Sequence, residues 1–136
     1  MQKASQNLIV VEDEPLIAIM LMDLVEDLGW TVDGSAYTAE EAFSLLAECN
    51  PKLAILDINL GQTTSLEVAS ACRERGIPIV FVTGYTAQDV PLECGNAPIL
   101  PKPFSAESLR RSIQRALAIE PAETRPPMDS PIQTTP

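Results

Sequence analysis

The sequence predicts a doubly wound α/β domain, a parallel sheet with helices on both faces. Short aliphatic runs that resemble buried strands alternate along the chain with segments whose apolar residues recur at helical spacing. The aliphatic runs are nearly uninterrupted, as in parallel strands that are buried on both faces. Right-handed crossovers then leave a doubly wound sheet as the simplest topology, and 136 residues suit one such domain.

Five strands and four helices follow one another in this alternation. The strands are predicted at residues 8–12, 31–36, 53–57, 78–84 and 98–102. The helices are predicted at residues 16–28, 39–49, 65–73 and 105–119. The connection over residues 86–98 should carry a further helix, but Pro91 allows at most a short one. We therefore expect this connection to be short, irregular or mobile.

Residues at the ends of the predicted helices favour a start or a stop. Pro15 suits a first turn, and Gly29 suits a stop. Thr38 with Glu41 predicts a capping box, and Ser65 could cap the next helix. In the first and last helices, apolar spacing predicts the side that faces the sheet. The residues concerned are Ile17, Met20, Leu21, Leu24 and Leu28, and then Leu109, Ile113, Ala116 and Leu117.

Charge and composition argue against several kinds of partner and site. The net charge of −10, from 19 acidic and 9 basic residues, repels phosphate backbones, so we expect no contact with nucleic acid. No apolar run approaches the about 20 residues that cross a bilayer, and the N-terminus is not a signal peptide. We therefore expect a cytoplasmic protein without membrane contact. The chain has no histidine, and its three cysteines are interpreted as reduced packing residues.

The predicted domain covers residues 8–119, between an N-terminal arm at 1–7 and a tail at 120–136. The tail has five prolines in 17 residues and almost no apolar anchors, so we expect it to be disordered. Its RPPMDSP stretch could dock on a proline-reading module, but a solvated tail is the simpler interpretation. We expect no output domain there, so that any output depends on binding.

Polar residues gather where the predicted strands end. They are Glu12, Asp13 and Glu14 after the first strand, Asp57 at the third, Thr83 and Gly84 at the fourth, and Lys102 at the fifth. Ligands of doubly wound sheets bind outside the carboxyl ends of the strands, so the fold would bring this set together. Each residue has a plain alternative, such as a helix-start acid or a solvated lysine. Those alternatives do not explain why all of them fall on one edge.

The chemistry of this set favours phosphoryl transfer to a carboxylate. Three carboxylates lie together only if cations neutralise them, and Mg²⁺ prefers oxygen ligands. Asp57 could act as the nucleophile and form an aspartyl phosphate. Lys102, Mg²⁺ and the Thr83 hydroxyl would stabilise the phosphoryl oxygens, and Gly84 would leave space beside them.

The motifs LIVVEDE, LAILDINL, FVTG and LPKPF follow one another at the spacing of a response-regulator receiver domain from two-component signalling. The chain resembles this family over residues 8 to about 119. The resemblance implies a flavodoxin-like fold with five parallel strands in the order 2-1-3-4-5.

The resemblance also implies a role for each residue of the metal and phosphoryl site. Asp57 matches the phosphoacceptor aspartate. Asp13 matches the acid that binds Mg²⁺ directly, and Glu12 matches the acid that usually acts through water. Asn59 matches the position whose backbone carbonyl binds the metal. Lys102 matches the invariant lysine, and the peptide bond that follows it is commonly cis in this family.

The remaining motif residues concern the switch. Thr83 matches the hydroxyl residue that moves toward the phosphoryl group on activation. Many receivers have an aromatic residue where this chain has Ile99, so the chain departs here from the usual threonine–aromatic switch. FVTGYT is similar to a motif in a subgroup of stand-alone receivers, which points to Thr83, Gly84 and Tyr85 as the switch. The alternative for Tyr85 is an ordinary core or surface tyrosine. The fourth helix of that subgroup is often poorly ordered, in agreement with the expectation for residues 86–98.

By this resemblance the chain is a non-enzymatic phosphoacceptor with Mg²⁺ as its cofactor. A sensor histidine kinase or a phosphohistidine relay protein would supply the phosphoryl group, and phosphorylation would switch binding to a downstream target protein. An aspartyl-phosphate phosphatase would need an acid at Asn59, and a flavin-binding module would need a phosphate loop in place of the acidic EDEPL. A receiver-like adaptor that works without phosphorylation stays open as the alternative.

Overall fold

A computed structural model of the chain describes residues 6–84 and 90–119. A five-stranded parallel sheet in the order β2-β1-β3-β6-β7 forms its centre. The strands are β1 (Asn7–Val11), β2 (Thr31–Ala36), β3 (Leu53–Asp57), β6 (Ile79–Thr83) and β7 (Ile99–Pro101). The helices are α1 (Pro15–Asp27), α2 (Ala39–Glu48), α3 (Leu66–Glu74) and α4 (Ala106–Ala118). Numbered within this sheet alone, the strand order is 2-1-3-4-5, which confirms the predicted fold.

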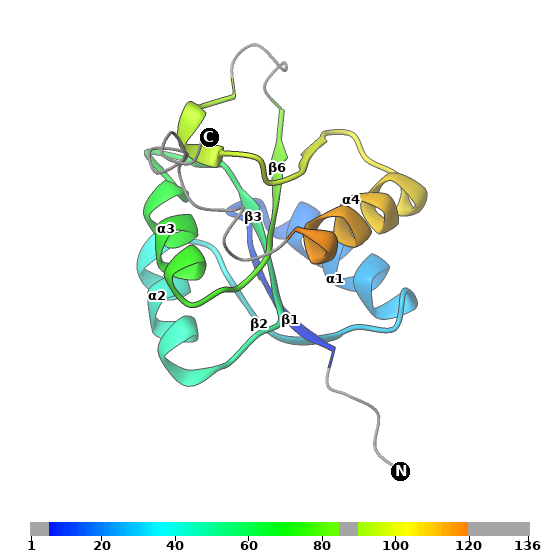
Figure 1. The fold of residues 1–136 in the computed structure, drawn as a ribbon, viewed down its shortest axis with the longest axis horizontal. Helices are drawn as coiled ribbons and strands as arrows, with labels where there is room; N and C mark the ends of the chain where they lie inside the picture. The colour runs from blue at the N-terminus through cyan, green and yellow to red at the C-terminus, as the bar shows by residue number, and fades with distance from the viewer. Residues whose placement is uncertain (1–5, 85–89, 120–136) are drawn as a thin grey trace, which may run out of the picture.

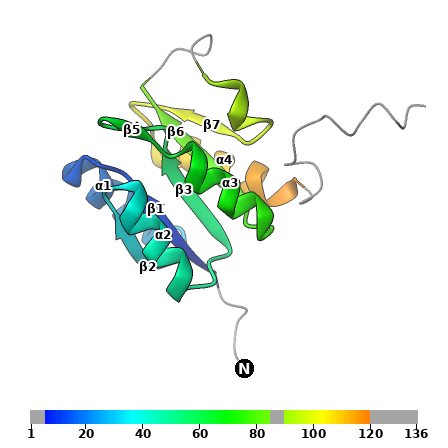
Figure 2. The ribbon, with the colours of Figure 1, turned by 90° about the vertical axis from the view of Figure 1, so that its left-hand side faces the viewer.

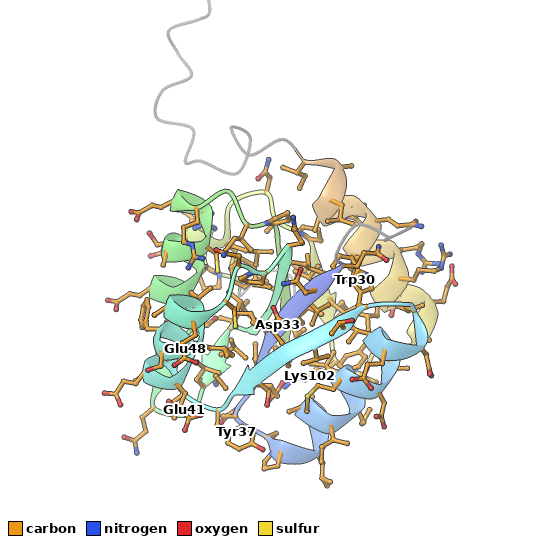
Figure 3. The ribbon with its side chains drawn as sticks, turned by 90° about the horizontal axis from the view of Figure 1, so that it is seen from below. Trp30, Asp33, Tyr37, Glu41, Glu48 and Lys102 are labelled. Carbon is orange, nitrogen blue, oxygen red and sulfur yellow. The ribbon has the colours of Figure 1, made fainter. Side chains whose placement is uncertain are left out.

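The helices form two layers, with α1 and α4 on one face of the sheet and α2 and α3 on the other (Figure 1). Neighbouring residues of a strand point to opposite faces, so each strand supplies both layers. In β1, Leu8 and Val10 pack with α1 and α4, whereas Ile9 and Val11 pack with α2 and α3. This double burial explains why the central strands β1, β3 and β6 are apolar along most of their length, whereas the edge strand β2 is polar and partly exposed. Seen from the β2 edge, α1 and α2 lie on either side of that strand (Figure 3).

The predicted helix starts are only partly correct. The Thr38 hydroxyl accepts the N–H of Glu41 at 3.1 Å, as in a capping box. The Glu41 carboxylate, however, accepts the N–H of Tyr37 at 2.8 Å, one residue before the cap, and these two side chains lie together in Figure 3. The hydroxyl of Ser65 makes no cap bond, although this residue is fully buried at the N-cap position. Instead, the Thr64 hydroxyl accepts the N–H of Leu66 at 3.3 Å.

Two of the predicted inward-facing residues are exposed. In α1 the buried residues are Ala18, Leu21 and Val25, whereas Met20 is 46% exposed. In α4 the side chain of Leu117 is also 46% exposed. Helix α1 has more apolar side chains than one stripe can bury, and in both helices apolar spacing alone misplaced the edge of the buried side.

Two further elements complete the fold. The connection between β3 and α3 is an antiparallel hairpin of β4 (Asn59–Leu60) and β5 (Thr63–Thr64), which the sequence analysis did not predict. It stands beyond the carboxyl end of β3 (Figure 2). Residues 90–98 contain one short 3₁₀ helix, η2 (Leu92–Cys94), within the limit that Pro91 sets. No helix of the described residues is long and apolar enough to span a membrane.

Some predictions concern residues that the structure does not describe. The prediction for Tyr85 falls within residues 85–89, and the predicted tail covers residues 120–136. Most of the predicted N-terminal arm, residues 1–5, also lies outside the described residues. All three cysteines are described, and they are free thiols.

Candidate functional site

The candidate site lies at the carboxyl edge of the parallel sheet, where neighbouring strands end at the same level. Val11 of β1 is paired with Leu56 of β3, so Glu12 and Asp57, the residues that follow them, lie side by side. Thr83 of β6 is paired with Pro101 of β7, which brings Lys102 to the same edge. Strand β3 is in turn paired with β6. The register of these three strand pairs therefore assembles a site from residues that are far apart in the sequence.

Lys102 bridges two buried carboxylates. Its Nζ lies 2.9 Å from Oδ2 of Asp57 and 3.4 Å from Oε1 of Glu12. Glu12 is 0% exposed and Asp57 is 4% exposed. One ammonium group therefore faces two carboxylates that are almost out of contact with solvent.

The carboxylates of Glu12 and Asp57 each accept a hydrogen bond from a backbone N–H two residues further along the chain. The N–H of Glu14 donates to Oε2 of Glu12 at 3.0 Å, and the N–H of Asn59 donates to Oδ1 of Asp57 at 3.1 Å. In each case the backbone two residues further on binds one carboxylate oxygen, and the other oxygen faces Lys102. Both carboxylates are thus fixed before any ligand arrives.

Asp13 completes the acidic group and differs from the other two. One carboxylate oxygen from each of Glu12, Asp13 and Asp57 lies within 4.8 Å of the others. Asp13 is half-buried, and no hydrogen bond or ion pair of its side chain occurs among the described residues. It lines an open cavity of about 410 Å³ together with Asp57, Asn59, Gly61, Gly84 and Lys102.

The charges of the site are incompletely balanced. Burial raises the pKa of Glu12 to about 7, although the N–H of Glu14 opposes this shift, and nearby Asp57 adds to it. Burial also opposes the charged form of Lys102, but Asp57 and Glu12 outweigh it and raise the pKa of the lysine. Oε1 of Glu12 is buried and accepts no hydrogen bond. Three carboxylates are therefore balanced by only one ammonium group among the residues of this site, so the site can accept the charge of a further cation.

The donor set fits a hard divalent cation. All the candidate ligand atoms are oxygens, the ligand type that Mg²⁺ and Ca²⁺ prefer. A cation held by few carboxylates, with an open cavity for its water ligands, corresponds to the usual coordination of Mg²⁺ in proteins. The residues present are therefore compatible with bound Mg²⁺.

The remaining predicted residues lie around this cavity. Asn59 is exposed, and Gly84 faces open space on the cavity wall. Thr83 is 1% exposed at the end of β6. Ile99 is half-buried on β7 and packs against the α2 and α3 side of the core. The bond between Lys102 and Pro103 is cis.

The sequence analysis missed Gly61, which lies on the cavity wall at the tip of the β4–β5 hairpin. Its φ of +82° is a conformation that glycine adopts most easily. A glycine followed by four polar residues in LGQTTS is the one signal that could have indicated a hairpin turn here.

Comparisons with known proteins agree with this geometry. A family model described as the response regulator receiver domain matches residues 8–114. The phyllosphere-induced regulator PhyR of Methylorubrum extorquens is 34% identical over 126 residues, which cover 88% of this chain and 46% of that protein. The chain spans about half the length of the curated relatives it matches.

Two solved structures are similar over most of the chain. SdrG from Sphingomonas melonis Fr1 is 37% identical, with a TM-score of 0.76 over 87% of this chain and 100% of that one. The response regulator TrrA from Thermotoga maritima, solved in complex with Mg(2+)-BeF, is 28% identical. Its TM-score is 0.73 over 82% of this chain and 99% of that one.

Proposed function

The chain belongs to the receiver-domain family of response regulators, and on this premise we propose that it accepts a phosphoryl group on Asp57 in a reaction that needs Mg²⁺. The observation that supports the proposal best is the contact of Lys102 with both Asp57 and Glu12 beside Asp13. This arrangement combines a buried nucleophile, a fixed positive charge and an oxygen-lined cation site.

The proposed reaction transfers the phosphoryl group from a phosphohistidine on a donor protein. A carboxylate oxygen of Asp57 forms a bond to phosphorus, and the bond between phosphorus and the imidazole nitrogen breaks. The nitrogen keeps the electron pair and regains its proton on the donor. The N–H of Asn59 and the ammonium of Lys102 hold the Asp57 carboxylate in position, which lowers the entropic cost of attack.

Lys102 also stabilises the charge that the transferred group brings. The ammonium is in place before the reaction, so no reorganisation is needed as the phosphoryl oxygens arrive. Gly84 leaves space at the cavity wall, and the hydroxyl of Thr83 is the proposed hydrogen-bond donor to the acyl phosphate. Movement of Thr83, with Gly84 and Tyr85, would then carry the change to the surface.

Mg²⁺ would be held by Asp13, Asp57 and the backbone carbonyl of Asn59, with Glu12 acting through water. When bound, the ion would neutralise charge on the phosphoryl oxygens. The related protein TrrA, solved in complex with Mg(2+)-BeF, supports this assignment.

A histidine kinase or a phosphohistidine relay protein is the proposed donor, and the surface beside the site supports a protein in this role. Leu16, Ile19 and Met20 of α1 are 73%, 49% and 46% exposed, and α1 begins just after Asp13 and Glu14. An apolar strip of this kind is suited to contact with another protein. The proposed output is altered binding of a downstream target protein.

The test is phosphorylation by acetyl phosphate, followed by intact-mass spectrometry. The wild type is expected to gain one phosphoryl adduct with Mg²⁺ and none with EDTA. Asp57→Asn should gain no adduct, whereas Glu67→Gln, which removes an exposed acid at the start of α3, should behave as the wild type. An adduct on Asp57→Asn would show that another carboxylate is the acceptor. No adduct from acetyl phosphate or from phosphorylated kinases would favour the phosphorylation-independent adaptor.

A further inference from the structure

The β4–β5 hairpin forms one wall of the candidate cation site. Asn59 is paired with Thr64 and Leu60 with Thr63, so Gly61 and Gln62 make the turn. The hairpin is anchored from below, because Leu60 is 6% exposed and belongs to the core between the sheet, α2 and α3. The N–H of Ser65 closes its base by donating to the carbonyl of Ile58 at 3.0 Å. The turn is therefore held in place beside the cavity.

Gly61 faces Asp13 without a side chain between them. A Cβ added at Gly61 would lie 3.5 Å from Oδ2 of Asp13, and no other heavy atom outside its chain neighbours lies within 4 Å. Asp13 is also the acid whose side chain has no hydrogen bond among the described residues, whereas Glu12 and Asp57 each accept a backbone N–H. The hairpin backbone is thus the surface that faces the least constrained ligand of the site.

We propose that Gly61 is a positioning residue for the cation, because its bare backbone keeps the space beside Oδ2 of Asp13 open. Mg²⁺ keeps several water ligands when it binds to few carboxylates, so the space around those carboxylates matters. A methyl group at 3.5 Å would exclude water from one side of the Asp13 carboxylate and restrict the position of that side chain. This inference rests on the proposed metal site and adds a residue that the receiver motifs do not include.

The test measures Mg²⁺ binding by isothermal titration calorimetry on the unphosphorylated full chain. Gly61→Ala is expected to weaken Mg²⁺ binding about tenfold, the lower end of the range for changes around metal ligands. The matched control is Gly76→Ala, since Gly76 has a similar φ of +72° and nothing within 4 Å of an added Cβ. Both variants meet the same kind of backbone strain, but only Gly61→Ala is expected to lose Mg²⁺ affinity.

A double variant shows whether Gly61 acts through Asp13. In the Asp13→Asn background, Gly61→Ala should cause no further loss of affinity. Higher Mg²⁺ concentrations should restore the yield of the acetyl phosphate adduct in Gly61→Ala. Circular dichroism reports whether each variant is folded, and Gly61→Asn replaces Gly61→Ala if the latter unfolds, because asparagine tolerates positive φ.

The outcomes separate this inference from the proposed function. Equal Mg²⁺ affinity in the wild type and a folded Gly61 variant would overturn the role of Gly61 and leave the proposed function intact. An equal loss in Gly76→Ala would also overturn it, because general strain would then account for the effect. A wild type that binds no Mg²⁺ would overturn both.

Discussion

Helices α1 and α4 have the same length of 13 residues and cover the same face of the sheet, yet their ends are built differently. In α4, Ser105 and Ser108 form a capping box, Glu107 stands in the first turn, and Arg115 stands in the last. The serines form hydrogen bonds with free backbone N–H groups at the N-terminus of the helix. The charges of the glutamate and the arginine interact favourably with the helix dipole at the two ends. Helix α4 therefore has favourable local interactions at both ends, in addition to the burial of Leu109, Ile113 and Ala116.

Helix α1 lacks these capping and charged side chains; its local end features are Pro15 in the first turn and Gly29, with a φ of +99°, after the last turn. Its N-cap residue, Glu14, makes no side-chain cap bond, and its last turn contains Glu26 and Asp27 but no basic residue. Carboxylates at a helix C-terminus interact unfavourably with the helix dipole. With no side-chain cap and unfavourable charges in its last turn, helix α1 depends more on the burial of Ala18, Leu21 and Val25 against the sheet.

The candidate site explains this difference. The N–H of Glu14 donates to Glu12, so the residues where α1 would be capped are those that position the site carboxylates. In the chain that leads to α4, Pro103 and Phe104 separate Lys102 from the cap residue Ser105. These two residues allow the segment before α4 to supply both a site residue and a separate helix cap. Before α1, the N-cap residue Glu14 directly follows the site acid Asp13, so no residue is left between site and cap.

The largest expected effect tests whether burial holds α1. Leu21→Ala, at a residue 1% exposed, should lower the free energy of unfolding by about 3 kcal/mol, from lost burial and a cavity. Met20→Ala, at the exposed neighbour in the same helix, should cost less than about 1 kcal/mol. Urea denaturation of the two variants gives the comparison. Similar losses would show that burial does not hold α1 in place.

The next effect distinguishes the acids at the starts of the two helices. Mg²⁺ at a hundredfold excess over its Kd should stabilise the wild type by about 2.7 kcal/mol through mass action. This gain should shrink in Asp13→Asn but persist in Glu107→Gln, because Glu107 pairs with arginines of α4 and lies outside the acidic group. Thermal unfolding with Mg²⁺ and with EDTA measures the gain. If both variants lose it equally, the cation acts through general charge screening.

A smaller effect concerns the caps. Ser105→Ala removes the acceptor for the N–H of Ser108 and should cost about 1 kcal/mol. Glu14→Ala at the equivalent position of α1 should change the free energy of unfolding by less than about 0.5 kcal/mol, since its side chain makes no cap bond. Urea denaturation of both variants is again sufficient. A larger loss in Glu14→Ala would contradict the proposed division between the helices.

The smallest expected effect on the free energy of unfolding has opposite signs at the C-terminal ends of helices α1 and α4. Neutralising α1 by Glu26→Gln and Asp27→Asn should stabilise the protein by about 0.5 kcal/mol, because two charges unfavourable to the dipole are removed. Arg115→Gln in α4 should destabilise it by a similar amount, about 0.5 kcal/mol. Both changes should decrease at high salt, which screens exposed charges. A loss of stability in the α1 variant would show that its acids have favourable partners.

Much of the fold could be predicted because its signals are local. The three central strands, β1, β3 and β6, appear in the sequence as apolar runs. Gly29, at a φ of +99°, ends α1 as predicted. The β4–β5 hairpin could not be predicted in the same way. Its strands have two residues each, as in the pair of Asn59 with Thr64, and two residues are too few to show the alternation of apolar and polar residues that indicates a strand. The exposure of Met20 and Leu117 also depends on how far the sheet extends beneath each helix.

The element types, the order of the motifs and the residue types that could form the site all follow from the order of amino acids along the chain. Each of these follows from a neighbour-to-neighbour pattern, so no distant contact is needed. The direct contact of Lys102 with Asp57, 45 positions apart, and the position of Asp13 opposite Gly61 arise when the domain folds. These contacts depend on strand register and side-chain direction, which packing of the whole domain determines.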